Sequence, residues 1–213
     1  MPRVRADDYD DKARTIMDAA AALFARTGYP GAKMQDIAKS CGASKSMLYH
    51  YFPTKDDLLF GMLKEHLEEL IDGIEGLRES SRDPHQRFLA FVQLYVQRSA
   101  QARRRHVVAM NDVKYLPKAR QSPLLELEGT VVELASTLLK ELNPHLDEAL
   151  YKPYTMMLIG MLNWTEIWYR PSGAMKSDEL CDRITRLFLA GFLSEKSTPR
   201  DVAPSRGRRI PVS

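Results

Sequence analysis

Residues 34–57 constrain the fold more than any other part of the chain, and they read MQDIAKSCGASKSMLYHYFPTKDD. Ile37 gives the first half an apolar side, and Gly42 can adopt the left-handed backbone conformation that a tight turn needs. Ser44 can cap a following helix, which should end before Pro53 because the residue preceding a proline disfavours helix. The run therefore predicts two short helices joined by a glycine turn.

The helical period separates the side chains after Ser44 into two faces. The apolar face, which can anchor the helix, comprises Met47, Leu48, Tyr51 and Phe52. The opposite face, whose side chains can donate hydrogen bonds to phosphates or base edges, comprises Lys45, Ser46, Tyr49 and His50. This is the layout of a DNA-binding helix-turn-helix. Thr54 and Asp57 then form a capping box that starts the next helix.

Residues 38–58 closely resemble the DNA-binding signature of the TetR family of transcriptional repressors, and residues 16–29 resemble that family's first helix. The Tyr-x-Tyr-Phe run followed by Pro-Thr-Lys makes the match specific, whereas the alternative is a helical hairpin in another all-helical protein. The resemblance implies a homodimer on double-stranded operator DNA. The side chains expected at the DNA are Lys33, Gln35, Ser44, Lys45, Ser46, Tyr49, His50, Thr54 and Lys55.

Bulk properties place the chain among globular proteins. The 213 residues are 44% hydrophobic, and no apolar run approaches the ~20 residues that cross a bilayer. The N-terminus lacks the apolar centre of a secretion signal, and two separated cysteines give no disulfide framework. We therefore expect a cytoplasmic protein without a membrane partner. The net charge of +3 is a poor argument for DNA binding, because residues 1–60 are nearly balanced.

Apolar periodicity predicts an all-α fold of about nine helices, with a three-helix helix-turn-helix domain before a helical ligand-binding and dimerisation domain. The expected domains are residues 1–53 and 54–195, followed by a flexible basic tail, 196–213. The first nine or so residues should be a flexible arm. The first expected helices cover residues 10–27, 54–79, a segment opened by Asp83 and Pro84, and a short stretch through Met110. The later ones cover residues 122–142, a segment opened by Asn143 and Pro144 and ending at Tyr169, and residues 176–193. Pro153 either kinks the helix that ends at Tyr169 or starts its main part. Pro117 and Pro123 should bracket a loop.

No catalytic or metal-binding pattern is visible. The five histidines are scattered, and neither a glycine-rich phosphate loop nor a nucleophile elbow is present. We therefore expect a regulator without a cofactor and not an enzyme. The rival classes are an enzyme on a helical scaffold, which would need a catalytic pair in a cavity, and an architectural DNA-binding protein, whose second domain would be fully packed.

Residues 162–173, LNWTEIWYRPSG, resemble a signature in a subgroup of TetR regulators of fatty-acid, steroid or aromatic-acid catabolism. The subgroup resemblance implies a repressor released from its operator by an acyl-CoA or related CoA thioester. A multidrug or free-acid sensor controlling an efflux or catabolic gene is the alternative, and a drug sensor would need buried acids for cationic ligands. Release would follow a population shift towards a dimer that no longer matches its half-sites.

A CoA thioester needs an apolar pocket for its acyl part and cations for its phosphates. The expected ligand-binding residues are Phe88, Tyr95, Arg103, Arg104, Met157, Trp164 and Trp168, with Met156, Arg105, Lys114 and Arg120 as further candidates. Packing in a core or dimer interface, and a solvated basic surface, are the alternatives for these side chains. The TetR resemblance also implies that the last two long helices form a four-helix bundle with a second copy.

Overall fold

The computed structural model describes residues 3–79, 81–101 and 103–196, and this part contains nine α-helices and no strand, which confirms the all-α prediction. The α-helices are α1 (Arg3–Gly31), α2 (Met34–Ser40), α3 (Lys45–Tyr51), α4 (Lys55–Gly76), α5 (Pro84–Gln101), α6 (Arg103–Asp112), α7 (Lys118–Leu142), α8 (Glu148–Trp168) and α9 (Ser177–Phe192). Two 3-10 turns, η1 (Leu77–Glu79) and η2 (Val113–Tyr115), follow α4 and α6. The expected flexible tail falls almost wholly outside the described residues.

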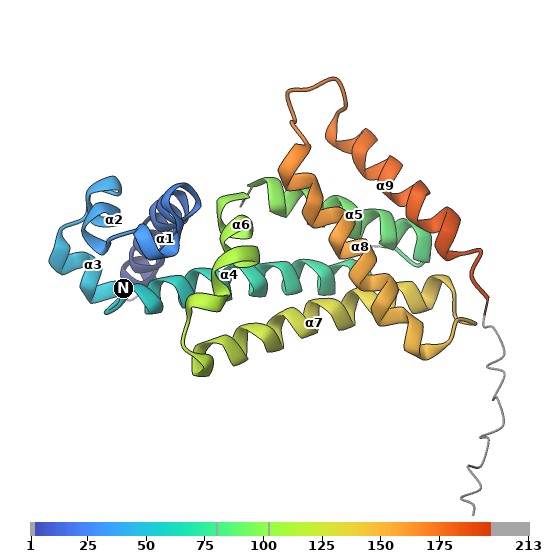
Figure 1. Cartoon of the computed structure of the whole chain (residues 1–213), viewed down its shortest axis with the longest axis horizontal. Helices are drawn as coiled ribbons and strands as arrows, with labels where there is room; N and C mark the ends of the chain where they lie inside the picture. Colours follow the sequence, from blue (N-terminus) through green and yellow to red (C-terminus); the bar gives the residue numbers. More distant parts are fainter. Residues whose placement is uncertain (1–2, 80, 102, 197–213) are drawn as a thin grey trace, which may run out of the picture.

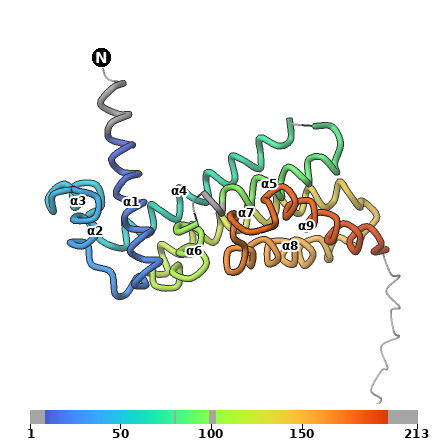
Figure 2. Tube along the Cα trace, turned by 90° about the horizontal axis from the view of Figure 1, so that it is seen from above, coloured from blue at the N-terminus to red at the C-terminus, as the bar shows by residue number. Residues whose placement is uncertain are grey.

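The helices are arranged along the long axis of the molecule (Figures 1 and 2). Their side chains form two hydrophobic cores. The first core joins α1–α3 to the first half of α4, and it also takes Val108 of α6 and Leu124 of α7. The second joins the end of α4 to α5 and α7–α9 around Phe88, Phe91 and Phe188. Burying each such side chain stabilises the fold by about 1.5–3 kcal/mol. The N-terminal helices therefore share their core with segments from later in the chain.

Helix α4 connects the two cores, because its buried residues run from Leu58 to Ile74. It packs on α7, while α1 packs on α6 (Figure 1). A displacement of α4 in the second core would therefore be felt by α1–α3. Among the described helices, none has the length and apolar character that crossing a bilayer would require.

The prediction that the first nine or so residues form a flexible arm is wrong for the residues that the structure describes, because α1 already begins at Arg3. The added turns bring Tyr9 onto α3, where its ring stacks on Tyr51 with centroids 4.4 Å apart. This contact gives the start of α1 a packing partner that helical periodicity alone does not reveal. At the other end, Gly28 (φ 71°) interrupts the helix before Pro30.

Two proline predictions also need correction. Helix α7 begins at Lys118, so Pro123 lies inside the helix and no loop separates it from Pro117. Asn143 and Pro144 do not open α8. Asp147 caps that helix by accepting a hydrogen bond from Ala149 N at 3.0 Å. Asn143 is buried and its amide donates to Phe192 O and Glu195 O, which ties α7 to the end of α9.

Candidate nucleic-acid interface and ligand cavity

The predicted helix-turn-helix is formed by α2 and α3. Gly42 makes the turn at φ 64°, and the Ser44 hydroxyl caps α3 by accepting a hydrogen bond from Met47 N at 3.1 Å. Leu48 is fully buried and anchors α3. Met47 is 39% exposed and does not share this role, contrary to the prediction from periodicity. A seven-residue helix thus buries only a narrow apolar stripe.

The side chains expected at the DNA belong to α2, α3, their flanking residues and the start of α4, and these elements lie at one end of the molecule (Figure 1). Exposed members of this set are Lys33, Gln35, Ser44, Lys45, Ser46, Tyr49, His50 and Thr54. The Lys45 ammonium lies 5.9 Å from the Tyr49 ring centroid. The arrangement leaves these groups available to a phosphate backbone or a groove, and their contact with DNA stays a prediction.

Lys55 differs from the rest because it is half-buried in a cluster between α1 and α4. Its ammonium donates to Tyr29 O at 2.8 Å and Ala32 O at 3.0 Å, and lies 4.3 Å from the Tyr29 ring centroid. The Tyr29 hydroxyl donates to Asp56. An ammonium has three donors, so one proton is left for a phosphate at the start of α4, where the helix dipole also favours anions.

Lys55→Ala should weaken binding to every DNA sequence and reduce the salt slope of log K by about one unit, because one phosphate contact is lost. The variant should also unfold at lower temperature, since two backbone carbonyls lose their donor. Fluorescence anisotropy across a salt series measures the slope. Lys64→Ala, which removes an exposed i,i+4 ion pair of the same helix, is the matched control. An unchanged slope would contradict the phosphate role and leave Lys55 as a structural clamp.

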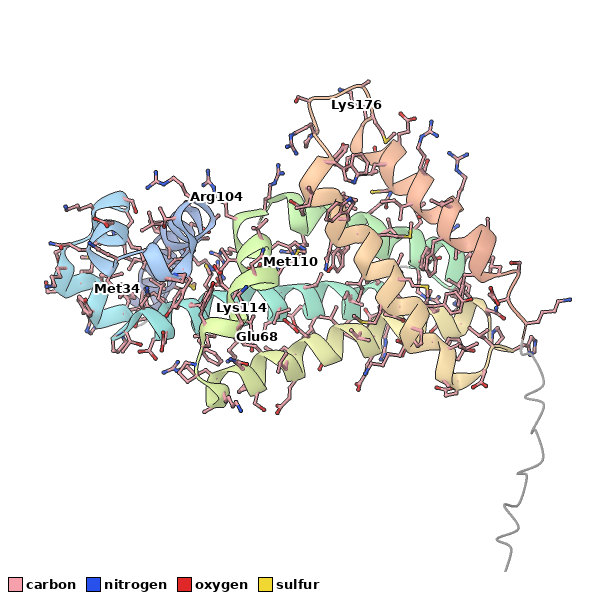
Figure 3. All side chains as sticks on the ribbon, viewed as in Figure 1. Met34, Glu68, Arg104, Met110, Lys114 and Lys176 are labelled. Atoms are coloured by element: carbon pink, nitrogen blue, oxygen red, sulfur yellow. The ribbon has the colours of Figure 1, made fainter. Side chains whose placement is uncertain are left out.

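A cavity of about 520 Å³ lies between α4, α5, α6, α7 and α8. Its apolar wall comprises Leu67, Leu70, Ala109, Met110, Val113, Leu125, Val131, Val132, Met156 and Ile159. Its polar groups are His66, Tyr95, His106, Asn111, Lys114, Glu128 and Asn163. Figure 3 labels Met110 and Lys114 along the α6–η2 segment, with Arg104 at the other end of α6. This composition suits an organic ligand with a few polar groups.

Four side chains form one hydrogen-bonded row in this wall. Tyr95 donates its hydroxyl to Asn163 Oδ1 at 2.7 Å, and His106 Nε2 lies 3.1 Å from the same oxygen. Because an amide oxygen only accepts, His106 carries its proton on Nε2. His106 Nδ1 then accepts from His66 Nε2, 3.2 Å away. Burial lowers the pKa of both histidines, so both are neutral at neutral pH. In the described residues no group of His, Cys, Asp and Glu could hold a metal ion.

Of the seven expected ligand-binding residues, Tyr95 lines this cavity and the other six do not. A ligand-binding role for these residues stays a prediction. Phe88 is fully buried and stacks on Phe188, with centroids 5.7 Å apart. Met157, Trp164 and Trp168 are 60%, 63% and 50% exposed on α8. Their apolar surface faces outward, whereas Met156 lines the cavity.

The expected basic cluster is also dispersed. Arg103 pairs with Glu166, and Arg105 is buried against Asp18 and Glu65. Arg104 is exposed and does not line the cavity, and Arg120 pairs with Asp57. Lys114 is therefore the member of the predicted cationic set that lines the cavity. Sequence reasoning missed His66, His106, Asn163 and Glu128 as cavity residues, since they come from four helices that are far apart in sequence.

Comparisons with known proteins agree with this architecture. A model of bacterial regulatory proteins of the tetR family matches residues 16–62, and a tetracyclin repressor-like C-terminal domain model matches residues 81–192. A solved TetR-family transcriptional regulator from Bordetella parapertussis is 36% identical, with a TM-score of 0.79 over 87% of this chain and 98% of that one. The transcriptional repressor KstR2 of Rhodococcus jostii is 26% identical over 89% of this chain and 96% of its own.

AibR, solved with isovaleryl coenzyme A and operator DNA, is 18% identical with a TM-score of 0.73, covering 83% of this chain and 97% of that one, which shows a shared fold. The C-terminal model alone spans more than half of the chain, and the Bordetella protein matches over nearly all of it. The chain therefore belongs to the TetR family of transcriptional regulators, and it is a DNA-binding regulator and not an enzyme.

Proposed function

We propose that the protein is a homodimeric repressor that an acyl-CoA or related CoA thioester of lipid, steroid or aromatic-acid catabolism releases from its operator. Residues 1–53 would bind DNA in the cytoplasm, and residues 54–195 would bind the effector and the second copy. The observation that supports this most is the largely apolar cavity of about 520 Å³, because an architectural protein without an effector would have a packed second domain.

Two observations favour a CoA thioester. KstR2 is named as a transcriptional repressor and, from Mycobacterium tuberculosis, as a ketosteroid transcriptional regulator, and AibR was solved with isovaleryl coenzyme A. The cavity offers an apolar wall for an acyl group, and exposed Lys114 offers a cation for the anionic part. Acyl and phosphate recognition would then come from one site.

The α6–η2 segment connects this cavity to the DNA-binding helices, because its successive residues face different ways. His106, Met110 and Lys114 line the cavity. Arg105 bonds Asp18 of α1, and Tyr115 stacks on Tyr29 with centroids 5.9 Å apart. A ligand that shifts this segment would therefore shift α1 and the Lys55 cluster, which changes the spacing of the two recognition helices in the dimer.

Release of the protein from its own promoter DNA tests the proposal. CoA thioesters of straight-chain, steroid-derived and aromatic acids should lower operator binding in a mobility-shift assay, whereas the matching free acids should act only at far higher concentration, since they lack the phosphate contacts. A direct binding measurement on the dimer supplies the affinity. Release by free acids alone would contradict the CoA proposal.

A sensor of cationic drugs is the second candidate, and Glu128 is the observation that favours it. This carboxylate lines the cavity, as the site for a cationic drug requires. Cationic drugs therefore belong in the same release assay, and release by them alone would make this candidate the better one. Lys114 lines the same cavity and opposes this candidate, because its positive charge repels a cationic ligand.

A further inference from the structure

Glu128 is a carboxylate in a largely apolar cavity with nothing to neutralise it directly. It lies on α7, on the same face as Leu125, Val131 and Val132, and is half-buried. Across the described part of the chain, no hydrogen bond or ion pair reaches its oxygens. Burial raises the pKa of this carboxyl above its usual value. A ligand that donates a hydrogen bond here would replace the water that burial has removed.

Asn163 supplies the opposite chemistry. Its Oδ1 accepts from both Tyr95 and His106, which fixes the orientation of the amide. The Nδ2 group therefore keeps two donors that meet no acceptor in the described residues, and Asn163 lines the cavity. A carbonyl oxygen in the cavity could accept from this group.

Both groups line the same cavity as Tyr95. The Tyr95 hydroxyl is 2.7 Å from Asn163 Oδ1, and the charge of Glu128 is close enough to raise the pKa of that hydroxyl further after burial has raised it. A fixed donor and an acceptor without a partner in the described residues thus line the same cavity as Tyr95. The remaining wall is largely apolar, which suits a hydrocarbon chain.

We propose that Glu128 and Asn163 make this cavity selective for an acyl group that carries a hydroxyl: the hydroxyl donates to Glu128, and the acyl carbonyl accepts from Asn163. The proposal rests on the acyl effector of the proposed function and adds the substituent that the site selects. An unsubstituted chain would leave the carboxylate desolvated without a donor, and a site with buried polar groups discriminates against such an analogue. A neutral hydroxyl fits better than an ammonium because the cationic Lys114 also lines the cavity and would repel a second positive charge.

Calorimetric titration of the full-length dimer with β-hydroxyoctanoyl-CoA and octanoyl-CoA tests the selectivity. The hydroxylated thioester should bind roughly ten- to a hundredfold tighter, as expected for one hydrogen bond to a charged group. E128L should lose this preference while binding octanoyl-CoA at least as well as the native protein does. E126L changes an exposed carboxylate of the same helix that does not line the cavity, and it should keep the preference.

Equal affinities in the native protein, or a preference that survives in E128L, would overturn the proposal. If E128L does not fold by circular dichroism, E128Q takes its place: it keeps an uncharged acceptor, so the preference should shrink, and an unchanged ratio would overturn the proposal as well. The free β-hydroxyoctanoate and octanoate pair separates the two hypotheses. Acids that bind as well as thioesters contradict the CoA effector, while the hydroxyl preference within the acid pair still tests Glu128. Failure of both pairs to bind overturns the hydroxyl-selective acyl site, whereas the release assay with steroid-derived and aromatic thioesters decides the CoA effector separately.

Discussion

Changing Trp164 and Leu187 together to aspartate should leave the protein monomeric and lower operator affinity on the order of a hundredfold or more, because each half-site is then bound without the other. Trp164 on α8 is 63% exposed and Leu187 on α9 is 71% exposed, and Met157 and Trp168 add to the apolar surface of α8. Exposed apolar area of this kind marks an interface. Two carboxylates buried in it without partners would each cost several kcal/mol.

Sedimentation velocity and operator-binding anisotropy, measured at the same protein concentrations, check this expectation. The matched control carries Gln93→Asp and Gln97→Asp, which add the same charge to exposed positions of α5. It should stay dimeric and bind the operator as the native protein does. A double aspartate variant that still sediments as a dimer would place the interface elsewhere and contradict a bundle built from α8 and α9.

The DNA-binding end could be predicted from sequence because its structure is set by local chemistry. Gly42, the Ser44 cap, the stop at Pro53 and the Thr54 cap all act within a few residues of one another, and each lies where the sequence places it. The limit of local chemistry also explains why the helix start predicted at Asn143 and Pro144 is wrong. A cap-like residue can instead hydrogen-bond a distant carbonyl, and Asn143 does so at the end of α9.

The cavity could not be predicted because its polar row joins residues from four helices. His66 and His106 are 40 positions apart, and periodicity assigns each of them only to a face of its own helix. Asn163 lies inside the LNWTEIWYRPSG segment, but the tryptophans that made this segment conspicuous are the residues that point outward. Aromatic residues at helical spacing fit a core, a ligand site and a dimer interface equally well, so pattern alone could not assign them.

Arg105→Met should lower the free energy of unfolding by about 2 kcal/mol, because it removes the buried one of the two cations that pair with Glu65, the other being the exposed Arg14, while keeping an apolar stem of similar length. Arg105 is buried, with Nη2 2.8 Å from Asp18 Oδ1 and Nη1 bonded to Glu65. The Asp18 carboxylate is largely exposed, so its ion pair with Arg105 contributes little to the free energy of unfolding. Most of the lost stability therefore comes from the ion pair between Arg105 and Glu65. Chemical denaturation of the dimer at fixed concentration measures the change.

Glu65→Gln combined with Arg105→Met separates this ion pair from general packing. If the pair stabilises the fold, the double variant should be more stable than the sum of the two single losses predicts, by about 1 kcal/mol. Arg104→Met, at the exposed neighbouring position, should change stability by less than about 0.5 kcal/mol.

The same variants test whether α6 couples the cavity to the DNA-binding helices, because His106 lines the cavity next to Arg105 in the chain. Arg105→Met should bind the effector with normal affinity but should need a higher effector concentration to leave the operator. The reason is that the substitution removes the ion pairs that connect α6 to α1 and α4. Stability and release that match those of Arg104→Met would show that α6 does not transmit the signal through this ion pair.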